Sequence, residues 1–161
     1  MPQFLIHYAL AFNPQSAHSS YVEPMLFWDT RYPSDYARFP GSHGHRLPAH
    51  VASQHATSPP VPIFRIVCGL FPHRAWSVEA HNSRGVTVGD VLSALHRALR
   101  HRARVAEAYY ARCRASADPA YEQRAGVRRI DWLLKSTGFV GLTPSVERGY
   151  TWSLTTKRAE K

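Results

Sequence analysis

The sequence has no long hydrophobic run and only two cysteines, and both shortages exclude classes of protein. No stretch of about 18 apolar residues occurs, so no membrane-spanning helix is predicted. The apolar stretch from Phe4 to Phe12 is too short, and it lacks the basic flank and small-residue cleavage site of a signal peptide. Cys68 and Cys113 give no disulfide framework, and their apolar contexts favour small buried side chains. We therefore expect a cytoplasmic or nuclear protein with no membrane partner.

The short motifs of common enzyme classes are also missing. Gly85 and Gly89 flank a predicted helix start without the spacing of a dinucleotide-binding loop. The sequence also lacks a Gly-x-Ser-x-Gly elbow, the motif that presents a nucleophilic serine. The sequence therefore predicts no cofactor and favours a protein without catalytic activity.

Lysine is scarce although the chain is strongly basic. The formal net charge is +9 and the isoelectric point about 10.1, yet only three of the 20 basic residues are lysines. Arginine suits bidentate contacts to phosphate and carboxylate, which fits nucleic acid or an acidic protein as partner. The alternative is that the arginine and alanine content reflects a GC-rich genome.

What the sequence does contain is ample apolar material for a folded core. Of 161 residues, 44% are hydrophobic and 12% aromatic, which predicts one soluble domain. We place this domain over residues 1–161, with a core at about 22–156. Near its start, Met25 to Asp29 is expected as a strand and Ser34 to Tyr36 as a turn. Gly41 to Pro60 has no Phe, Tyr or Trp, so a flexible surface loop is expected there.

A hairpin and a helix are expected next. Ile63 to Cys68 and Trp76 to His81 alternate apolar and polar residues, and the Gly/Pro connection favours antiparallel pairing. Thr87 with Asp90 matches a helix-capping pattern. Steps of three and four then place one apolar stripe along the helix, at Leu92, Leu95, Leu99, Ala103, Ala106, Tyr110 and Cys113. One long helix, or two helices bent near His101, would fit before Asp118-Pro119 ends the segment.

Three further strands are predicted in the last third of the chain, at Arg129–Leu134, Phe139–Leu142 and Tyr150–Thr155. The fold class is therefore α+β: an antiparallel sheet of about five strands with one long or two short helices packed on one face. The inward positions predict that Trp76, Trp132 and Trp152 share a buried face against Leu92, Leu95 and Leu99.

Several segments occur in a characteristic order: Phe27-Trp28-Asp29, Pro60-Val61-Pro62 before Ile63–Val67, Val86 to Leu92, and Phe139 to Ser145 followed by Trp152. From about Leu26 to Leu154 the chain thereby resembles a domain of unknown function common in mushroom-forming basidiomycete fungi. The resemblance implies a fungal source and a domain boundary, and no chemistry.

Histidines and acidic residues offer candidate chemical sites. Imidazoles bind zinc or copper, but the stretch with His43, His45, His50 and His55 has no Cys, Asp or Glu to complete a ligand set, so solvated histidines are expected. Asp29 beside Trp28 is either a general acid with a raised pKa or a strand-end residue that caps a turn near Arg31.

A second acidic group depends on how the strands pair. Glu79, His81 and Asp131 would form an acid/base group only if their strands were neighbours. Cross-strand pairing of Glu79 with Arg65 is the alternative.

A row of arginines is the most distinctive feature. Arg97, Arg100 and Arg104 are spaced three and four apart, opposite the apolar stripe. Such a row binds phosphates or an acidic protein, or it is simply solvated. Aromatic side chains beside it would favour single-stranded nucleic acid, and Tyr109 is the candidate near the row in the sequence.

Three functions therefore remain open. The first is a protein-interaction or scaffold module with an unidentified protein partner. The second is a nucleic-acid-binding module that uses Arg97, Arg100 and Arg104. The third is an enzyme with a site near Trp28 and Asp29.

Overall fold

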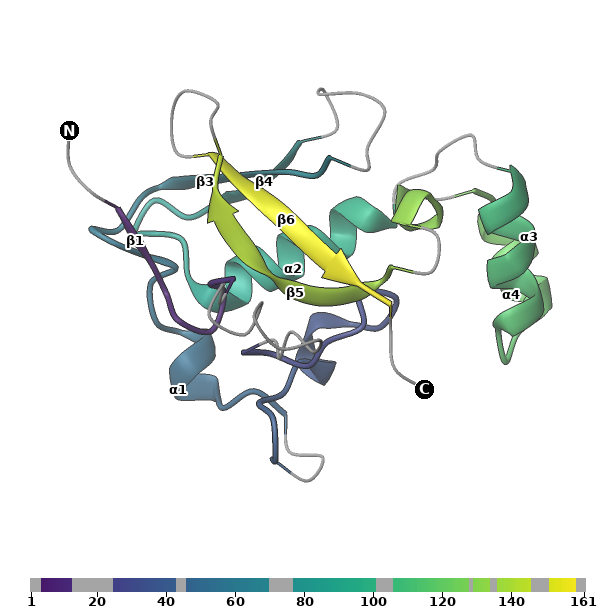
Figure 1. The fold of residues 1–161 in the computed structure, drawn as a ribbon, viewed down its shortest axis with the longest axis horizontal. Helices are drawn as coiled ribbons and strands as arrows, with labels where there is room; N and C mark the ends of the chain where they lie inside the picture. Colours follow the sequence, from purple (N-terminus) through teal and green to yellow (C-terminus); the bar gives the residue numbers. More distant parts are fainter. Residues whose placement is uncertain are drawn as a thin grey trace, which may run out of the picture.

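A computed structural model describes residues 4–12, 25–42, 46–69, 77–100, 106–127, 129–133, 136–145 and 151–158. The elements follow in the order β1 (Leu5–Ile6), η2 (Ser34–Tyr36), α1 (Ala49–Ala52), β2 (Thr57–Ser58), β3 (Ile63–Val67), β4 (Val78–His81), α2 (Val88–Leu99), α3 (Ala106–Ala115), α4 (Pro119–Ala125), η4 (Arg129–Leu133), β5 (Gly138–Pro144) and β6 (Thr151–Lys157). Helices and strands occur in one chain, so the α+β class is confirmed (Figure 1).

The main sheet has four strands in the order β4-β3-β6-β5, and it is mixed rather than antiparallel. β3 pairs antiparallel with β4, as the hairpin pattern predicts, and β5 pairs antiparallel with β6. The central pair is parallel: Ile66 lies opposite Trp152. The expectation of an antiparallel sheet of about five strands is wrong for this central pair. Strands close in sequence favour antiparallel pairing, but β3 and β6 are far apart in sequence, so that argument does not apply to them. β1 and β2 form a separate two-stranded sheet.

Helix α2 begins with a complete capping box. The Thr87 hydroxyl accepts a hydrogen bond from the Asp90 N–H, and the Asp90 carboxylate accepts one from the Thr87 N–H. Both bonds satisfy amide groups that a helix start leaves unpaired. The apolar stripe of α2 is buried and covers one face of the sheet (Figure 1). Its buried residues are Val88, Val91, Leu92, Ala94, Leu95 and Leu99.

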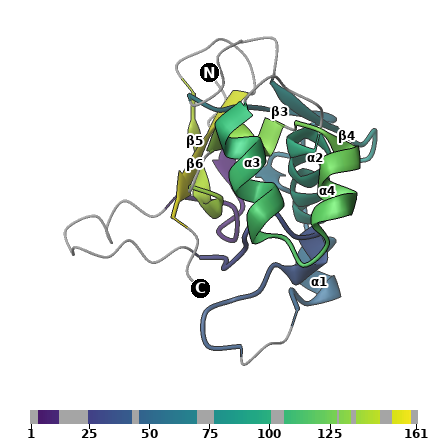
Figure 2. The ribbon, with the colours of Figure 1, turned by 90° about the vertical axis from the view of Figure 1, so that its right-hand side faces the viewer.

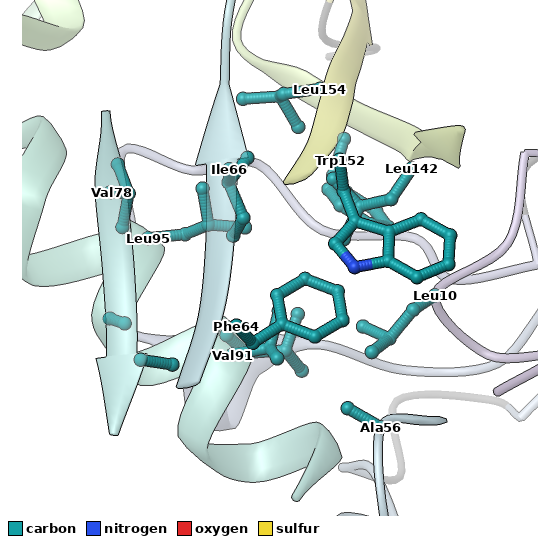
Figure 3. Close-up of a cluster of buried hydrophobic side chains, with 14 of the residues drawn as sticks. Leu10, Ala56, Phe64, Ile66, Val78, Val91, Leu95, Leu142, Trp152 and Leu154 are labelled. Atoms are coloured by element: carbon teal, nitrogen blue, oxygen red, sulfur yellow. The ribbon is translucent and has the colours of Figure 1, made fainter. Parts of the chain in front are cut away.

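The core lies between α2 and the sheet, and Figure 3 shows its centre. Phe64 and Ile66 alternate inward from β3, while Trp152 and Leu154 do so from β6. Of the three tryptophans expected on this face, Trp152 is buried there. Trp132 is half-buried and belongs to η4, so it does not share a strand face, and Trp76 lies outside the described residues.

The segment from Gly41 to Pro60 is not the solvated loop that its composition predicts. Its described residues include α1 and β2, and Val51 and Ala56 are buried in the core. Backbone hydrogen bonds also hold the segment in place. The Ala56 N–H donates to the Val86 carbonyl at 2.8 Å, and the Ala56 carbonyl accepts from the His7 N–H at 2.8 Å. Two isolated apolar positions are too few to produce a periodic pattern, so no pattern in the sequence indicates that this segment packs.

Two predictions for the second half also need correction. Residues 129–133 form a 3-10 helix, not a strand. Ile130 and Leu133 are buried, since residues three apart lie above one another in such a helix. α3 continues the buried stripe only in part: it packs against α4 and η4, Cys113 is buried outside the main core cluster, and Tyr110 is exposed. Figures 1 and 2 show α3 and α4 together at one end of the molecule.

The helix α4 was not expected from the sequence. The sequence predicts that Asp118-Pro119 ends a helix, yet the same pair also starts α4. The Asp118 carboxylate accepts a hydrogen bond from the Tyr121 N–H, and Pro119 occupies the first turn. Proline is well suited to that position because its missing N–H would have no partner there.

Candidate functional site

The arginines of the predicted row differ in exposure and in their hydrogen bonds. Arg97 is exposed on α2 and makes no ion pair with another described residue. Arg100 is half-buried: its Nε donates to His96 Nε2 at 3.1 Å, and its Nη2 donates to the Arg31 carbonyl at 2.9 Å. Arg104 lies outside the described residues. Arg97 is therefore exposed at the surface, whereas Arg100 holds a neighbouring segment.

That neighbouring segment contains η2 and packs on the outer side of α2. Besides the bond from Arg100 to Arg31, the hydroxyls of Ser34 and Ser93 lie 3.3 Å apart. Ser93, Arg97 and Arg100 follow at i, i+4 and i+7, so they share one face of the helix. Because Ser93 and Arg100 both contact the segment, Arg97 lies beside it.

Backbone bonds hold the start of this segment against β5. The Phe139 N–H donates to the Trp28 carbonyl at 2.8 Å, and the Thr30 N–H donates to the Thr137 carbonyl at 2.9 Å. Thr30 and Trp28 are buried, and the Trp28 indole N–H donates to the Tyr32 carbonyl at 3.2 Å. The turn that follows is thus fixed by the core on one side and by α2 on the other.

Two tyrosines project from this fixed turn into solvent. Tyr32 is 54% exposed and Tyr36 is 56% exposed, and their ring centroids lie 6.1 Å apart. In the sequence, Tyr109 is the candidate aromatic neighbour of the arginine row. Tyr32 and Tyr36 were missed because they are far from Arg97 in sequence, and only the packing of η2 on α2 brings them near.

Each tyrosine belongs to a unit that also contains an arginine and an aspartate. In the first unit, Arg31 lies over the Tyr32 ring at 5.9 Å and binds Asp29 with two nitrogens. The Arg31 N–H also donates to Asp29 Oδ1 at 3.0 Å, and the hydrogen bond to Asp29 raises the pKa of Arg31. Both Asp29 oxygens are engaged, so the structure agrees with the turn-capping interpretation of Asp29 and not with a general acid.

The second unit is more open. The Arg46 guanidinium lies over the Tyr36 ring at 5.4 Å, and its Nη1 donates to Asp35 Oδ2 at 2.9 Å. Arg46 is held close because the next residue, Leu47, donates its N–H to the Ala37 carbonyl at 2.7 Å. We call the surface formed by Arg31, Tyr32, Tyr36, Arg46 and Arg97 the tyrosine–arginine patch.

The histidine beneath the patch carries no extra charge at neutral pH. Burial lowers the pKa of His96 below its ordinary value, and the Arg100 guanidinium lowers it further. The carbonyl groups of Thr30 and Tyr32 act in the opposite direction but more weakly. The patch with Arg100 therefore holds four guanidinium groups against the two carboxylates of Asp29 and Asp35, so its net charge is positive.

The other candidate sites do not assemble. Glu79 pairs across the strands with Arg65, whose Nε donates at 2.8 Å, and His81 lies 3.2 Å from the other carboxylate oxygen. The hydrogen bond from Arg65 lowers the pKa of Glu79 most, against the effect of desolvation. Asp131 is elsewhere, on η4, where the Arg112 Nε donates to it at 2.6 Å. The cross-strand interpretation of Glu79 is thus confirmed.

No histidine cluster forms in the described part of the chain. His50 and His55 are exposed, His43 and His45 lie outside the described residues, and no group of three metal-ligand residues occurs among those described. The His55 ring instead lies close to Gly85, whose φ of 105° suits glycine.

A buried ionic group that the sequence does not predict connects α3 to its neighbours. Arg112 binds Asp131 of η4 and Glu122 of α4, and its Nη2 donates to the Gly126 carbonyl at 2.7 Å. All three charged side chains are mostly buried. The spacing of these residues along the chain is irregular, so no periodic pattern pointed to them. The group connects elements and leaves no free carboxylate at the surface.

Comparison with models of protein families gives a match. Residues 26–150 match the model of a family described as "Family of unknown function (DUF6699)". No curated protein and no solved structure matches the chain. The resemblance to a domain of unknown function is therefore confirmed at the level of the family, while the fungal source stays a prediction. Within the described residues, no helix is both long and apolar enough to cross a membrane.

Proposed function

The chain belongs to the DUF6699 family of unknown function, so membership supplies no activity, and we propose instead that this domain is a protein-interaction module. Its binding surface is the tyrosine–arginine patch, and its partner is an acidic segment of another protein. The observation that carries the proposal is the pair of exposed rings, Tyr32 and Tyr36, held in a segment that packs on α2, the helix that also exposes Arg97.

The composition of the patch supports this role. Tyrosine and arginine are enriched where binding energy concentrates at protein interfaces. Tyrosine buries a large area at little cost in conformational entropy, and the arginine guanidinium is weakly hydrated for a charged group. Tyr32 and Tyr36 are also held in place before binding, by backbone bonds to β5 and by guanidinium groups over both rings. A surface that is already ordered loses less entropy when a partner binds.

The charge of the patch supports an acidic partner. The patch contains three arginines, Arg31, Arg46 and Arg97, against the two carboxylates of Asp29 and Asp35, and the whole chain carries a net charge of +9. Opposite charge accelerates association and selects between partners more than it strengthens binding. An acidic segment with some apolar or aromatic residues would match both the arginines and the two rings.

Single-stranded nucleic acid is the second candidate, because exposed aromatic rings beside arginines also suit stacked bases. One observation favours the protein partner. The described positions on the open sheet face include Arg65, Glu79 and His81 but no Phe, Tyr or Trp on which bases could stack.

The test is binding of a fluorescent Glu-Gly-Tyr-Glu repeat peptide, measured by anisotropy near physiological salt. We expect Tyr32→Ala with Tyr36→Ala to weaken binding by about ten-fold, as for two contributing interface tyrosines. The matched control is Tyr110→Ala with Tyr121→Ala, which removes two equally exposed rings from α3 and α4. Equal losses in both double variants would refute the patch as the binding surface.

The arginine row is tested in the same assay. Arg97→Gln is expected to weaken peptide binding by about two- to five-fold and to reduce its salt dependence. The control is Arg124→Gln, an exposed arginine of α4. A single-stranded oligothymidylate forms the second arm. If it binds more tightly than the peptide, and if its slope of log affinity against log salt decreases in Arg97→Gln, then the nucleic-acid function replaces the proposed one.

A further inference from the structure

We infer that Arg46 is the carboxylate-binding anchor of the patch and that Asp35 is an internal competitor which the partner's carboxylate displaces. This inference rests on the proposed function and specifies how the partner is recognised. It follows from a difference between the two units of the patch, which contain the same three residue types in different geometry.

The unit of Arg31 and Asp29 is closed. Arg31 uses Nε and Nη2 on both Asp29 oxygens, and the Arg31 backbone N–H binds the same carboxylate. The Asp29 side chain is only 17% exposed. A carboxylate from outside would have to break several hydrogen bonds and unfold the turn in order to replace it.

The unit of Arg46 and Asp35 is open. One hydrogen bond joins Nη1 to Oδ2 at 2.9 Å, and the two side chains are 64% and 55% exposed. Guanidinium groups carry five N–H donors, so most of the donors of Arg46 are not used by Asp35. An exposed single-bond pair of this kind contributes little to stability, so breaking it costs little.

The ring beneath Arg46 keeps the guanidinium in position while its partner is exchanged. Arg46 lies 5.4 Å from the centre of the Tyr36 ring, and Tyr36 belongs to η2, which packs on α2. A stacked guanidinium has its donor edge directed sideways, where a carboxylate binds it with two parallel hydrogen bonds. The partner therefore gains a two-bond contact in place of the one-bond contact of Asp35.

The experiment compares Asp35→Asn with the wild type in the peptide-binding assay. Removing the competitor is expected to tighten binding by about two- to five-fold, the range that corresponds to an exposed ion pair. The gain should require Arg46: in Arg46→Gln, the further change Asp35→Asn should give no gain. This four-protein cycle isolates the coupling between the two residues from their separate effects.

A charge control is available on α4. Asp118→Asn removes one negative charge as well, and asparagine caps a helix as effectively as aspartate. Figure 1 shows α3 and α4 at the right-hand end, apart from the purple-blue segment near residues 34–36.

An equal gain in Asp118→Asn, or a gain in Asp35→Asn that persists without Arg46, would overturn the inference and leave the proposed function standing. If neither wild type nor Asp35→Asn binds the peptide, both are wrong. If only oligothymidylate binding tightens, the competitor acts on a nucleic acid and the inference fails.

Discussion

The indole of Trp152 lies flat against the phenyl ring of Phe64, with ring centroids 5.3 Å apart and the planes inclined by 5°. Phe64 comes from β3 and Trp152 from β6, so this contact joins the two central strands across the parallel pair (Figure 3). Both side chains are buried, yet the indole N–H has no acceptor among the described residues. A buried donor without a partner costs stability, so the position combines a strong apolar contact with an unfavourable polar group.

Trp152→Ala should therefore lower the free energy of unfolding by about 3–5 kcal/mol, the range for emptying a large aromatic site in a core. Trp152→Phe should lower it by less than about 2 kcal/mol, because it retains the ring contact and removes the unpaired N–H. Urea denaturation followed by circular dichroism measures both values. Equal losses in the two variants would show that the indole ring is irreplaceable, contrary to this account.

How much of this fold the sequence predicts depends on how far apart the interacting residues are. The β3–β4 hairpin and the Thr87 cap were predicted correctly, since their signals lie within a few residues of one another. The parallel pairing of β3 with β6 and the burial of Val51 depend on distant partners, and no local pattern reports them. Ile130 and Trp132 alternate as in a strand, yet two positions do not distinguish a strand from a 3-10 turn.

The candidate site shows the same limit. Arg97 was predicted to be exposed from its helical position alone, and it is. That Arg100 turns inward to the Arg31 carbonyl was not predictable, because periodicity places a residue on a face but does not identify its hydrogen-bond partner. Tyr32 and Tyr36 join the site only through the packing of η2 on α2.

The second prediction concerns acid sensitivity through His96. Burial and Arg100 lower the pKa of His96 in the folded protein below its ordinary value near 6.5. Below pH 6.5 the unfolded chain therefore binds a proton that the folded chain does not, so stability falls as the pH decreases toward the folded pKa. Urea denaturation between pH 5 and pH 8 should show this slope, and His96→Gln should reduce it.

The control for that experiment is His50→Gln, which removes an exposed imidazole from α1. Its slope provides the reference for the loss of a histidine as such. If His96→Gln and His50→Gln give the same dependence on pH, then His96 does not cause the acid sensitivity.

The third prediction concerns the ionic group around Arg112. Arg112→Met should lower the free energy of unfolding by about 3–5 kcal/mol, because the buried Asp131 carboxylate loses the guanidinium that offsets its charge. Adding Asp131→Asn should recover part of the loss, since the buried charge is then gone. Urea denaturation of the single and double variants measures the recovery. A double variant that is less stable than Arg112→Met alone would contradict this explanation.

The position of β6 has a consequence for when the chain can fold. β6 lies between β3 and β5 in the sheet. Its parallel pairing with β3 places Thr151 opposite Arg65, and these two residues are far apart in the sequence. Closing so long a loop costs entropy before any contact is gained, and contacts of this range slow folding. During synthesis on the ribosome, β3 is exposed along one edge until residues 151–157 emerge. The nascent hairpin of β3 and β4 therefore passes through a period in which it needs protection from pairing with other chains.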